Sequence, residues 1–358
     1  MDILLHLFYL MKKILLFCIV FIIGLITSFL IITFQSYTVY NNQIRTDIAI
    51  LQDEVSNNFI ATSLDLKRAT EVPELLGAFH PNTSASRLKL AKVYEQMIQN
   101  NSSYTQLRYI DAMGNEIVRV DQTDKGTTIV AQNELQNKAG RYYFSDTMKL
   151  GKNEYYISPL DLNVEGSKVI VPYEPTLRLA TPVFDSADTK VGMVIINYTV
   201  KNVLSELEKK DDNNPLYHVY FTNSDGDWFR GPSPEDAWAF MFPDGEVRRV
   251  KKKFPLLWSK IITSDSGSVV TPEGYFYFGK IKPITLVQQN ESIKESFSYF
   301  SRYLQVRDYY MVVIVHMPRE LFSHLLLDQV IGVNILYILS TGIGLAFMSM
   351  LLARKKLR

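Results

Sequence analysis

The two ends of the chain carry long apolar stretches without charge, and the middle mixes apolar and polar positions. Residues 14–34 contain no Asp, Glu, Lys or Arg, and neither do residues 329–353. A helix that rises 1.5 Å per residue needs about 20 apolar residues to cross a hydrocarbon core about 30 Å thick. The pattern therefore predicts two transmembrane helices, at 14–34 and at 329–353.

The charges that flank these stretches predict an orientation. Lys12 and Lys13 precede the first stretch, and four basic residues follow the second. Under the positive-inside rule, residues 1–13 and 354–358 are expected in the cytoplasm, and the region between the stretches on the outer side of the membrane. A cleaved signal peptide is the alternative for the first stretch, although its apolar core exceeds the usual length of about 7–15 residues. Met11 is an alternative natural start to Met1.

A helical period continues beyond the first stretch. Apolar residues recur at spacings of three and four from Tyr37 to Leu66, without Pro or Gly. We expect stalk and covering helices over residues 35–100. The stripe either packs on its own domain or pairs with a second copy in a parallel homodimer. The residues that would face the second copy are Tyr40, Ile44, Ile48, Leu51 and Val55.

Strand and turn signals then appear twice. In each case two runs of β-branched and aromatic residues flank a turn with glycine, Gly114 in the first and Gly226 in the second. Short helical segments and further strands follow each hairpin. The pattern predicts an α+β fold of two tandem PAS-like domains, membrane-distal at 101–205 and membrane-proximal at 206–318, with a helical connector at 319–328.

Composition and motifs exclude several functions. The single cysteine, Cys18, excludes a disulfide framework, and a formal net charge of +1 gives no support for nucleic acid binding. Phosphate-loop, nucleophile-elbow and zinc-protease motifs are absent, and the five histidines are scattered without ligand spacing. We expect no enzyme activity, metal or cofactor in this chain. The basic run at residues 248–253 is expected to be a solvated loop.

Ordered motifs in the middle of the chain resemble a known family. The first unit contains RYIDAMGNEIVRVD, LQNKAGRYYF and YYISPLDLN, and the second contains NSDGDWFRGPSPEDAWAFMF. Together they are similar to the extracytoplasmic double Cache (tandem PAS-like) sensor modules of bacterial membrane receptors. The resemblance implies a region that senses a small molecule and precedes a histidine kinase, diguanylate cyclase or chemoreceptor output. That output would lie in a missing C-terminal region or in a partner protein.

The resemblance also implies a ligand site between the sheet of the first unit and its covering helix, at Arg141, Tyr143, Tyr156 and Ser158. Arg178 is a further candidate, because it stands alone in an apolar strand and a buried unpaired charge is very costly. It binds a small carboxylate or other polar metabolite, or it forms an internal salt bridge, to Asp146, Asp161 or Glu174. The second unit is expected to be an aromatic core without a ligand.

The sequence thus predicts the sensory segment of a transmembrane signal receptor. The alternative is a membrane-anchored adaptor whose outer domains bind a periplasmic protein. A large exposed aromatic patch on the first unit would favour the adaptor, and a closed polar cavity would favour the receptor.

Overall fold

The computed structural model describes residues 2–72, 83–152, 154–165, 168–214, 216–243, 245–282 and 309–321, together with residues 331, 332, 335, 338 and 341. The predicted transmembrane helix at 329–353 therefore lies almost entirely outside the described residues. The same holds for the predicted connector beyond residue 321, whereas residues 319–321 are helical.

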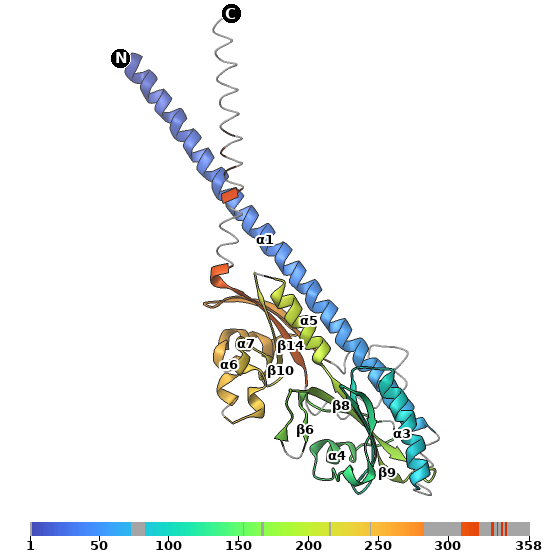
Figure 1. Ribbon diagram of the computed structural model, residues 1–358. Helices are drawn as coiled ribbons and strands as arrows, with labels where there is room; N and C mark the ends of the chain where they lie inside the picture. Colours follow the sequence, from blue (N-terminus) through green and yellow to red (C-terminus); the bar gives the residue numbers. More distant parts are fainter. Residues whose placement is uncertain are drawn as a thin grey trace, which may run out of the picture.

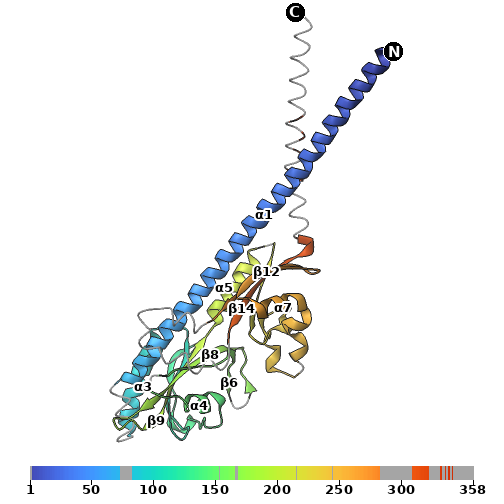
Figure 2. The same cartoon turned by 180° about the vertical axis from the view of Figure 1, so that it is seen from behind.

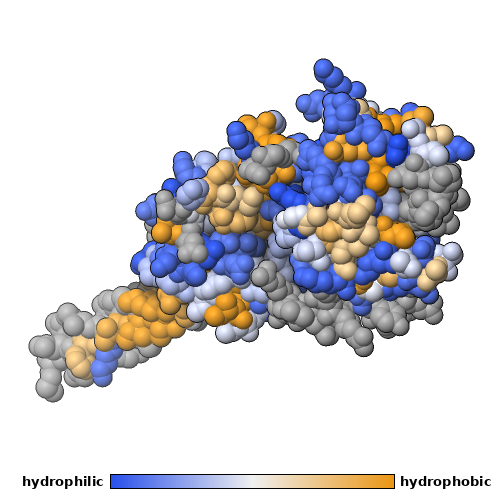
Figure 3. Space-filling view, turned by 90° about the horizontal axis from the view of Figure 1, so that it is seen from below, coloured by the Kyte–Doolittle hydropathy of each residue, from blue (hydrophilic) through white to orange (hydrophobic). Residues whose placement is uncertain are grey.

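A single long helix, α1 (Asp2–Glu71), begins the chain. It contains no proline, and its 70 residues span about 105 Å. Its N-terminal part projects from the body, and its C-terminal part lies along both sheets (Figures 1 and 2). Hydrophobic residues gather along the projecting part (Figure 3). Within the described part of the chain, no helix combines the length and the hydropathy that a membrane crossing requires.

The first sheet is antiparallel and has seven strands in the order β3-β2-β1-β9-β8-β4, with β5 also paired to β8. Helix α3 (Ser84–Gln99), which starts with a capping box at Thr83, covers one face together with α1, and α4 (Tyr142–Thr147) covers the other. The strands are β1 (Tyr104–Asp111), β2 (Glu116–Thr123), β3 (Gly126–Ile129), β4 (Tyr156–Ile157), β5 (Asp161–Leu162), β8 (Pro175–Phe184) and β9 (Lys190–Thr199).

The second sheet is also antiparallel, with five strands in the order β11-β10-β14-β13-β12. Helix α5 (Lys201–Asp212) connects the sheets, and α6 (Val250–Lys253) and α7 (Pro255–Thr263) pack on one face of the second. Its strands are β10 (His218–Asn223), β11 (Trp228–Arg230), β12 (Ser266–Thr271), β13 (Gly274–Ile281) and β14 (Met311–Pro318). The remaining elements are the hairpin β6 (Val164–Glu165) and β7 (Lys168–Val169), and the 3₁₀ helices η1 (Gln132–Glu134), η2 (Pro234–Asp236), η3 (Ala239–Met241) and η4 (Gly245–Arg248).

The apolar stripe of α1 belongs to the chain's own core. Ile44, Ile48, Leu51 and Val55 are between 1% and 5% exposed and pack in one cluster with both sheets. The homodimer interface predicted along this stripe is therefore wrong, because these side chains already leave water by contact with their own sheets. Tyr40, the remaining residue of that prediction, has a side chain outside the described part.

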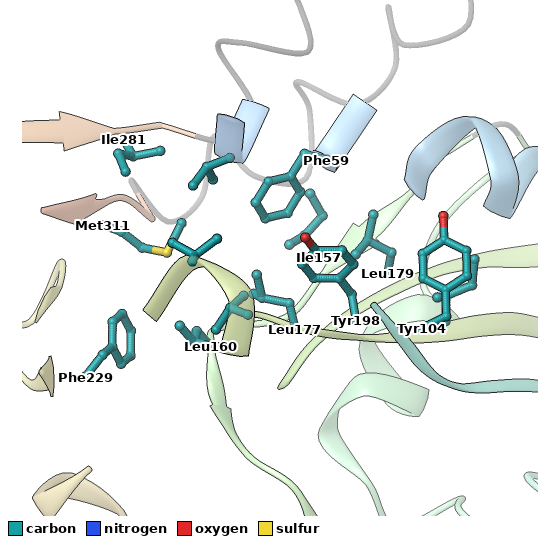
Figure 4. Packing of buried hydrophobic residues seen from close by; sticks show 14 of the residues in the cluster. Phe59, Tyr104, Ile157, Leu160, Leu177, Leu179, Tyr198, Phe229, Ile281 and Met311 are labelled. Atoms are coloured by element: carbon teal, nitrogen blue, oxygen red, sulfur yellow. The ribbon is translucent and has the colours of Figure 1, made fainter. Parts of the chain in front are cut away.

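One core cluster extends from α1 across both sheets. Phe59 of α1 lies near Tyr198 of the first sheet, and Met311 of the second sheet belongs to the same cluster (Figure 4). A hydrogen bond also joins the two sheets' segments, since the Leu160 N–H donates to the Tyr309 hydroxyl at 2.9 Å. The sheets are therefore connected by packed side chains and by a polar contact.

The basic run at 248–253 is only partly solvated, which corrects the expectation of a solvated loop. Arg249 pairs with Asp227 at 2.5 Å, and Lys253 pairs with Asp236 at 2.5 Å. Both acids precede the run in sequence, and the contacts fix α6 against the hairpin β10–β11 and against η2. Lys251 and Lys252 remain exposed.

Candidate functional site

Polar side chains cluster on the face of the first sheet that α4 covers. Arg178 of β8, Asn197 of β9 and Gln106 of β1 are neighbours in register. Side chains alternate along a strand, so Arg108 lies on the same face two residues further along β1. All four residues are buried. Their strand neighbours Leu177, Leu179 and Leu107 point to the opposite face, into the core with α1 and α3.

Arg178 forms an internal salt bridge. Its Nη1 lies 2.6 Å from Asp161 Oδ1, and the Tyr142 hydroxyl donates to Asp161 Oδ2 at 2.7 Å. Of the three acceptors expected for such a bridge, the structure uses Asp161. Burial alone would lower the pKa of Arg178, but Asp161 and the nearby Tyr142 outweigh it and raise that pKa. The guanidinium is therefore charged at every physiological pH.

Arg108 is a second buried arginine on this face, and the sequence analysis did not identify it. Its Nη2 donates to Asn197 Oδ1 at 2.8 Å, and its Nη1 lies 3.4 Å from both Glu116 Oε1 and the Tyr143 hydroxyl. Its buried Nε has no hydrogen-bond partner among the described residues. Arg108 stands in an apolar strand as Arg178 does, so the argument that singled out Arg178 applied to it as well.

Glu116 is the carboxylate that faces Arg108. Its side chain is fully buried and accepts a hydrogen bond from the Gln136 N–H at 3.0 Å. Lys138 and Arg119 approach the same carboxylate at 3.8 Å and 4.0 Å. The buried Glu116 carboxylate therefore lies within 4.0 Å of three cations. One is Arg108, on the face that α4 covers, and the other two are Lys138 and Arg119.

The Tyr143 ring is the centre of the cluster. The guanidinium carbons of Arg108, Arg141 and Arg178 lie 5.6, 5.9 and 5.6 Å from its centroid, within the range of cation–π contacts. The structure thus brings together the predicted residues Arg141, Tyr143 and Arg178. Arg141 precedes α4 and is half-buried, and its side chain has neither an ion pair nor a hydrogen bond within the described part of the chain.

The predicted residues Tyr156 and Ser158 lie beside this cluster. Tyr156 packs in an apolar cluster beneath α4 with Ile110 and Met193. The Ser158 hydroxyl accepts from the backbone N–H of Arg178 at 2.9 Å and donates to the Pro159 carbonyl at 2.8 Å. Ser158 therefore holds the chain after β4 against β8 and positions the backbone of Arg178.

This arrangement suits an anion. Three guanidinium groups lie near one tyrosine ring, and among the residues that the structure describes two of them face a carboxylate, Glu116 or Asp161. Guanidinium groups bind carboxylates and phosphates through paired N–H donors. Among the described residues, no group of three or more His, Cys, Asp or Glu side chains is placed to hold a metal ion.

Two antiparallel sheets with helices on their faces are consistent with a PAS-like fold. The family described as "Bacterial histidine kinase, sensor domain" matches residues 71–288. The chain belongs to this family of sensor domains.

Two solved structures share the fold of this chain. A domain of a sensory box/GGDEF family protein from Vibrio parahaemolyticus is 17% identical, with a TM-score of 0.65 over 79% of this chain and 97% of that one. The extracellular domain of the histidine kinase vpHK1S-Z8 is also 17% identical, with a TM-score of 0.65 over 79% of this chain and 92% of that one. At this identity the likeness shows the fold. The comparison with curated proteins gave no match.

Proposed function

We propose that the chain senses a small extracytoplasmic molecule with a carboxylate or another polar acceptor, bound between the first sheet and α4. The observation that carries this proposal is the Arg141 guanidinium, which has no ion pair in the described part of the chain and lies beside two arginines that each face a carboxylate. An anion at this place would find the Arg141 guanidinium 5.9 Å from the centre of the Tyr143 ring, with no carboxylate paired to it among the described residues. The family assignment supports a sensory role for the region.

Replacement of Arg141 by glutamine is expected to weaken ligand binding about ten- to hundredfold, because a charge-assisted hydrogen bond contributes about 1.5–3 kcal/mol. The full chain in detergent would be screened against small carboxylates and amino acids by thermal shift, and the affinity of each hit measured by calorimetry. Tyr143→Phe removes the hydroxyl and keeps the ring, and it should weaken binding to a smaller extent.

Arg68→Gln is the matched control, since Arg68 is 72% exposed in its side chain and lies on α1, away from α4. It should bind like the parent. If Arg141→Gln and Tyr143→Phe both melt like the parent and bind every hit with the parent's affinity, the ligand site lies elsewhere.

We further propose that the sensory region is anchored in the inner membrane by two helices and transmits to a cytoplasmic output absent from this chain. The uncharged sequence at 14–34 supports the first anchor, as do its exposed apolar side chains, among them Leu15 at 61% and Phe34 at 71% exposed. Reporter fusions after Arg358 and within 211–214 should report opposite compartments. Equal compartments for both fusions would contradict the two-anchor topology.

One observation favours the alternative of an adaptor that binds a periplasmic protein. Tyr173 and Phe242 are 44% and 40% exposed, and their rings lie 6.0 Å apart across the two sheets' loops. Val171 and Val247 are exposed as well, at 82% and 67%. If the ligand screen yields no hit, substitution of Tyr173 and Phe242 by serine tests this surface through loss of binding to candidate periplasmic proteins.

A further inference from the structure

His316 lies near the C-terminal end of β14 in an enclosed aromatic setting. It is 8% exposed, and its ring stacks on Phe276 with centroids 4.1 Å apart and an angle of 3° between planes. Phe254 and Tyr220 enclose the ring from other elements, with centroids at 5.7 and 5.9 Å. Little water can reach the imidazole from any of these directions.

The hydrogen bonds of His316 determine which ring nitrogen carries the proton. Nε2 lies 3.2 Å from the backbone carbonyl oxygen of Glu273, and a carbonyl can only accept, so Nε2 is the donor. In the neutral ring Nδ1 then accepts from the Tyr220 hydroxyl, 3.3 Å away. Burial, followed by the Asp211 charge, raises the pKa of Tyr220 to about 12, so this hydroxyl keeps its proton in neutral and acidic media.

Protonation of His316 would change this arrangement. Nδ1 would become a second donor, so the bond to Tyr220 would have to reverse, with the hydroxyl oxygen accepting and its own proton losing this acceptor. The new charge would also lie in an apolar enclosure, where the charged form is disfavoured. Burial accordingly lowers the pKa of His316, and the nearby His218 acts in the same direction, while Glu273 partly opposes both.

Because of where His316 lies, its protonation would affect the second sheet. β14 is the middle strand, paired with β10 on one side and β13 on the other. His316 precedes Pro318, where the strand ends and the helical residues 319–321 begin. The contact to Glu273 joins this strand end to the turn between β12 and β13.

We propose that His316 and Tyr220 form a proton-sensitive contact through which an acidic medium loosens the C-terminal end of β14. The contact is independent of the arginine cluster beneath α4. This inference rests on the proposed function in one respect, namely that the second sheet lies in the medium outside the cell.

The charged and titratable groups around this contact come from five elements. His218 lies directly opposite His316 in register on β10, with a half-exposed side chain that contacts Asp211 of α5 at 3.2 Å. Arg230 of β11 and Asp236 of η2 act on Tyr220, and Asp236 is itself paired with Lys253 of α6. Glu273 completes the set. Histidine is the side-chain type whose charge ordinarily changes between pH 5 and 8, and His316 is the histidine in the aromatic enclosure.

The sign of the pH dependence follows from the lowered pKa of His316. Between the folded-state pKa and the ordinary imidazole value of about 6.5, the opened strand binds a proton that the closed strand does not. The closed form is therefore most favoured above pH 6.5 and is progressively lost as the pH falls through this window. Because a single proton is involved, the effect cannot exceed about tenfold per pH unit.

Hydrogen exchange of the full chain in detergent tests the proposal. Amide protection of Met311–Pro318, corrected for intrinsic exchange, is expected to fall between pH 7.5 and pH 5 in the parent. In His316→Gln, whose amide can still donate to the Glu273 carbonyl but does not titrate in this range, protection should change little. The matched variant His218→Gln should keep most of the parent's pH dependence.

A direct titration keeps the proposal falsifiable even if His316→Gln does not fold. With five histidines in the chain, the ¹H–¹⁵N imidazole signals of the parent can be followed from pH 4.5 to 8, with the His218→Gln spectrum as an aid to assignment. A His316 signal that titrates below the ordinary range, with Nε2 protonated at pH 7.5, supports the contact. A signal that titrates at about pH 6.5 or above, or protection of β14 that is independent of pH in the parent, overturns it.

Discussion

Replacement of Glu116 by alanine is expected to lower the free energy of unfolding by about 3–5 kcal/mol, the cost of removing one partner from a buried ion pair. The substitution removes the carboxylate that faces Arg108, Lys138 and Arg119, and the Arg108 side chain, 3% exposed, would keep its charge without an anion. Urea unfolding of the full chain in detergent, followed by circular dichroism, would measure the loss.

Glu206→Ala provides the control for this change. Glu206 pairs with Lys209 on the surface of α5, where the two side chains are 45% and 63% exposed. Exposed pairs of this kind contribute about 0–1 kcal/mol, so this variant should unfold like the parent. Similar losses for the two variants would contradict the role given to Glu116.

Replacement of Trp228 by alanine is expected to cost about 3–5 kcal/mol, as for other large aromatic residues in a core. Trp228 is 1% exposed and contacts Tyr220 and Phe254 edge-on, with centroids at 5.8 and 6.3 Å. Its Nε1–H also donates to the Arg248 carbonyl at 2.6 Å, which holds the basic run against the hairpin β10–β11.

Trp258→Ala is the matched control for Trp228→Ala. It removes the same residue type from the edge of the same cluster, and Trp258 is only partly buried. This variant should lose clearly less stability than Trp228→Ala in the same urea titration. Equal losses would mean that the enclosed position of Trp228 contributes nothing beyond its size.

The sequence pattern was sufficient for the elements that obey a simple period. The stripe from Tyr37 to Leu66 predicted a long helix, and α1 runs without a break to Glu71. The same stripe could not reveal what covers it, because an apolar face looks alike whether it meets a sheet or a second helix. In the structure a sheet covers it. Gly279 of β13 lies so close to α1 that a Cβ on it would be 2.6 Å from Ile48, so α1 rests directly on β13.

The site was predictable in part for a related reason. Arg178 was identified because a charge in an apolar strand requires a partner, and the structure supplies Asp161. Arg108 and Glu116 meet across neighbouring strands, and their contact depends on a register that the sequence does not contain. Ser158 shows the converse, since the family resemblance implied a ligand contact there, whereas its hydroxyl accepts a hydrogen bond from the Arg178 backbone in the adjacent strand.

The place of β14 in the second sheet has a consequence for synthesis of the chain. Among the described strands, β14 is the last in sequence but the middle one of its sheet, with β10 and β11 on one side and β13 and β12 on the other. Until Met311–Pro318 leaves the ribosome, two separate two-stranded hairpins expose the edges that β14 later fills. Such hairpins are at best marginally stable, and their open edges can pair with other chains. The nascent second sheet therefore remains open to aggregation and to proteolysis until Met311–Pro318 can pair with both hairpins.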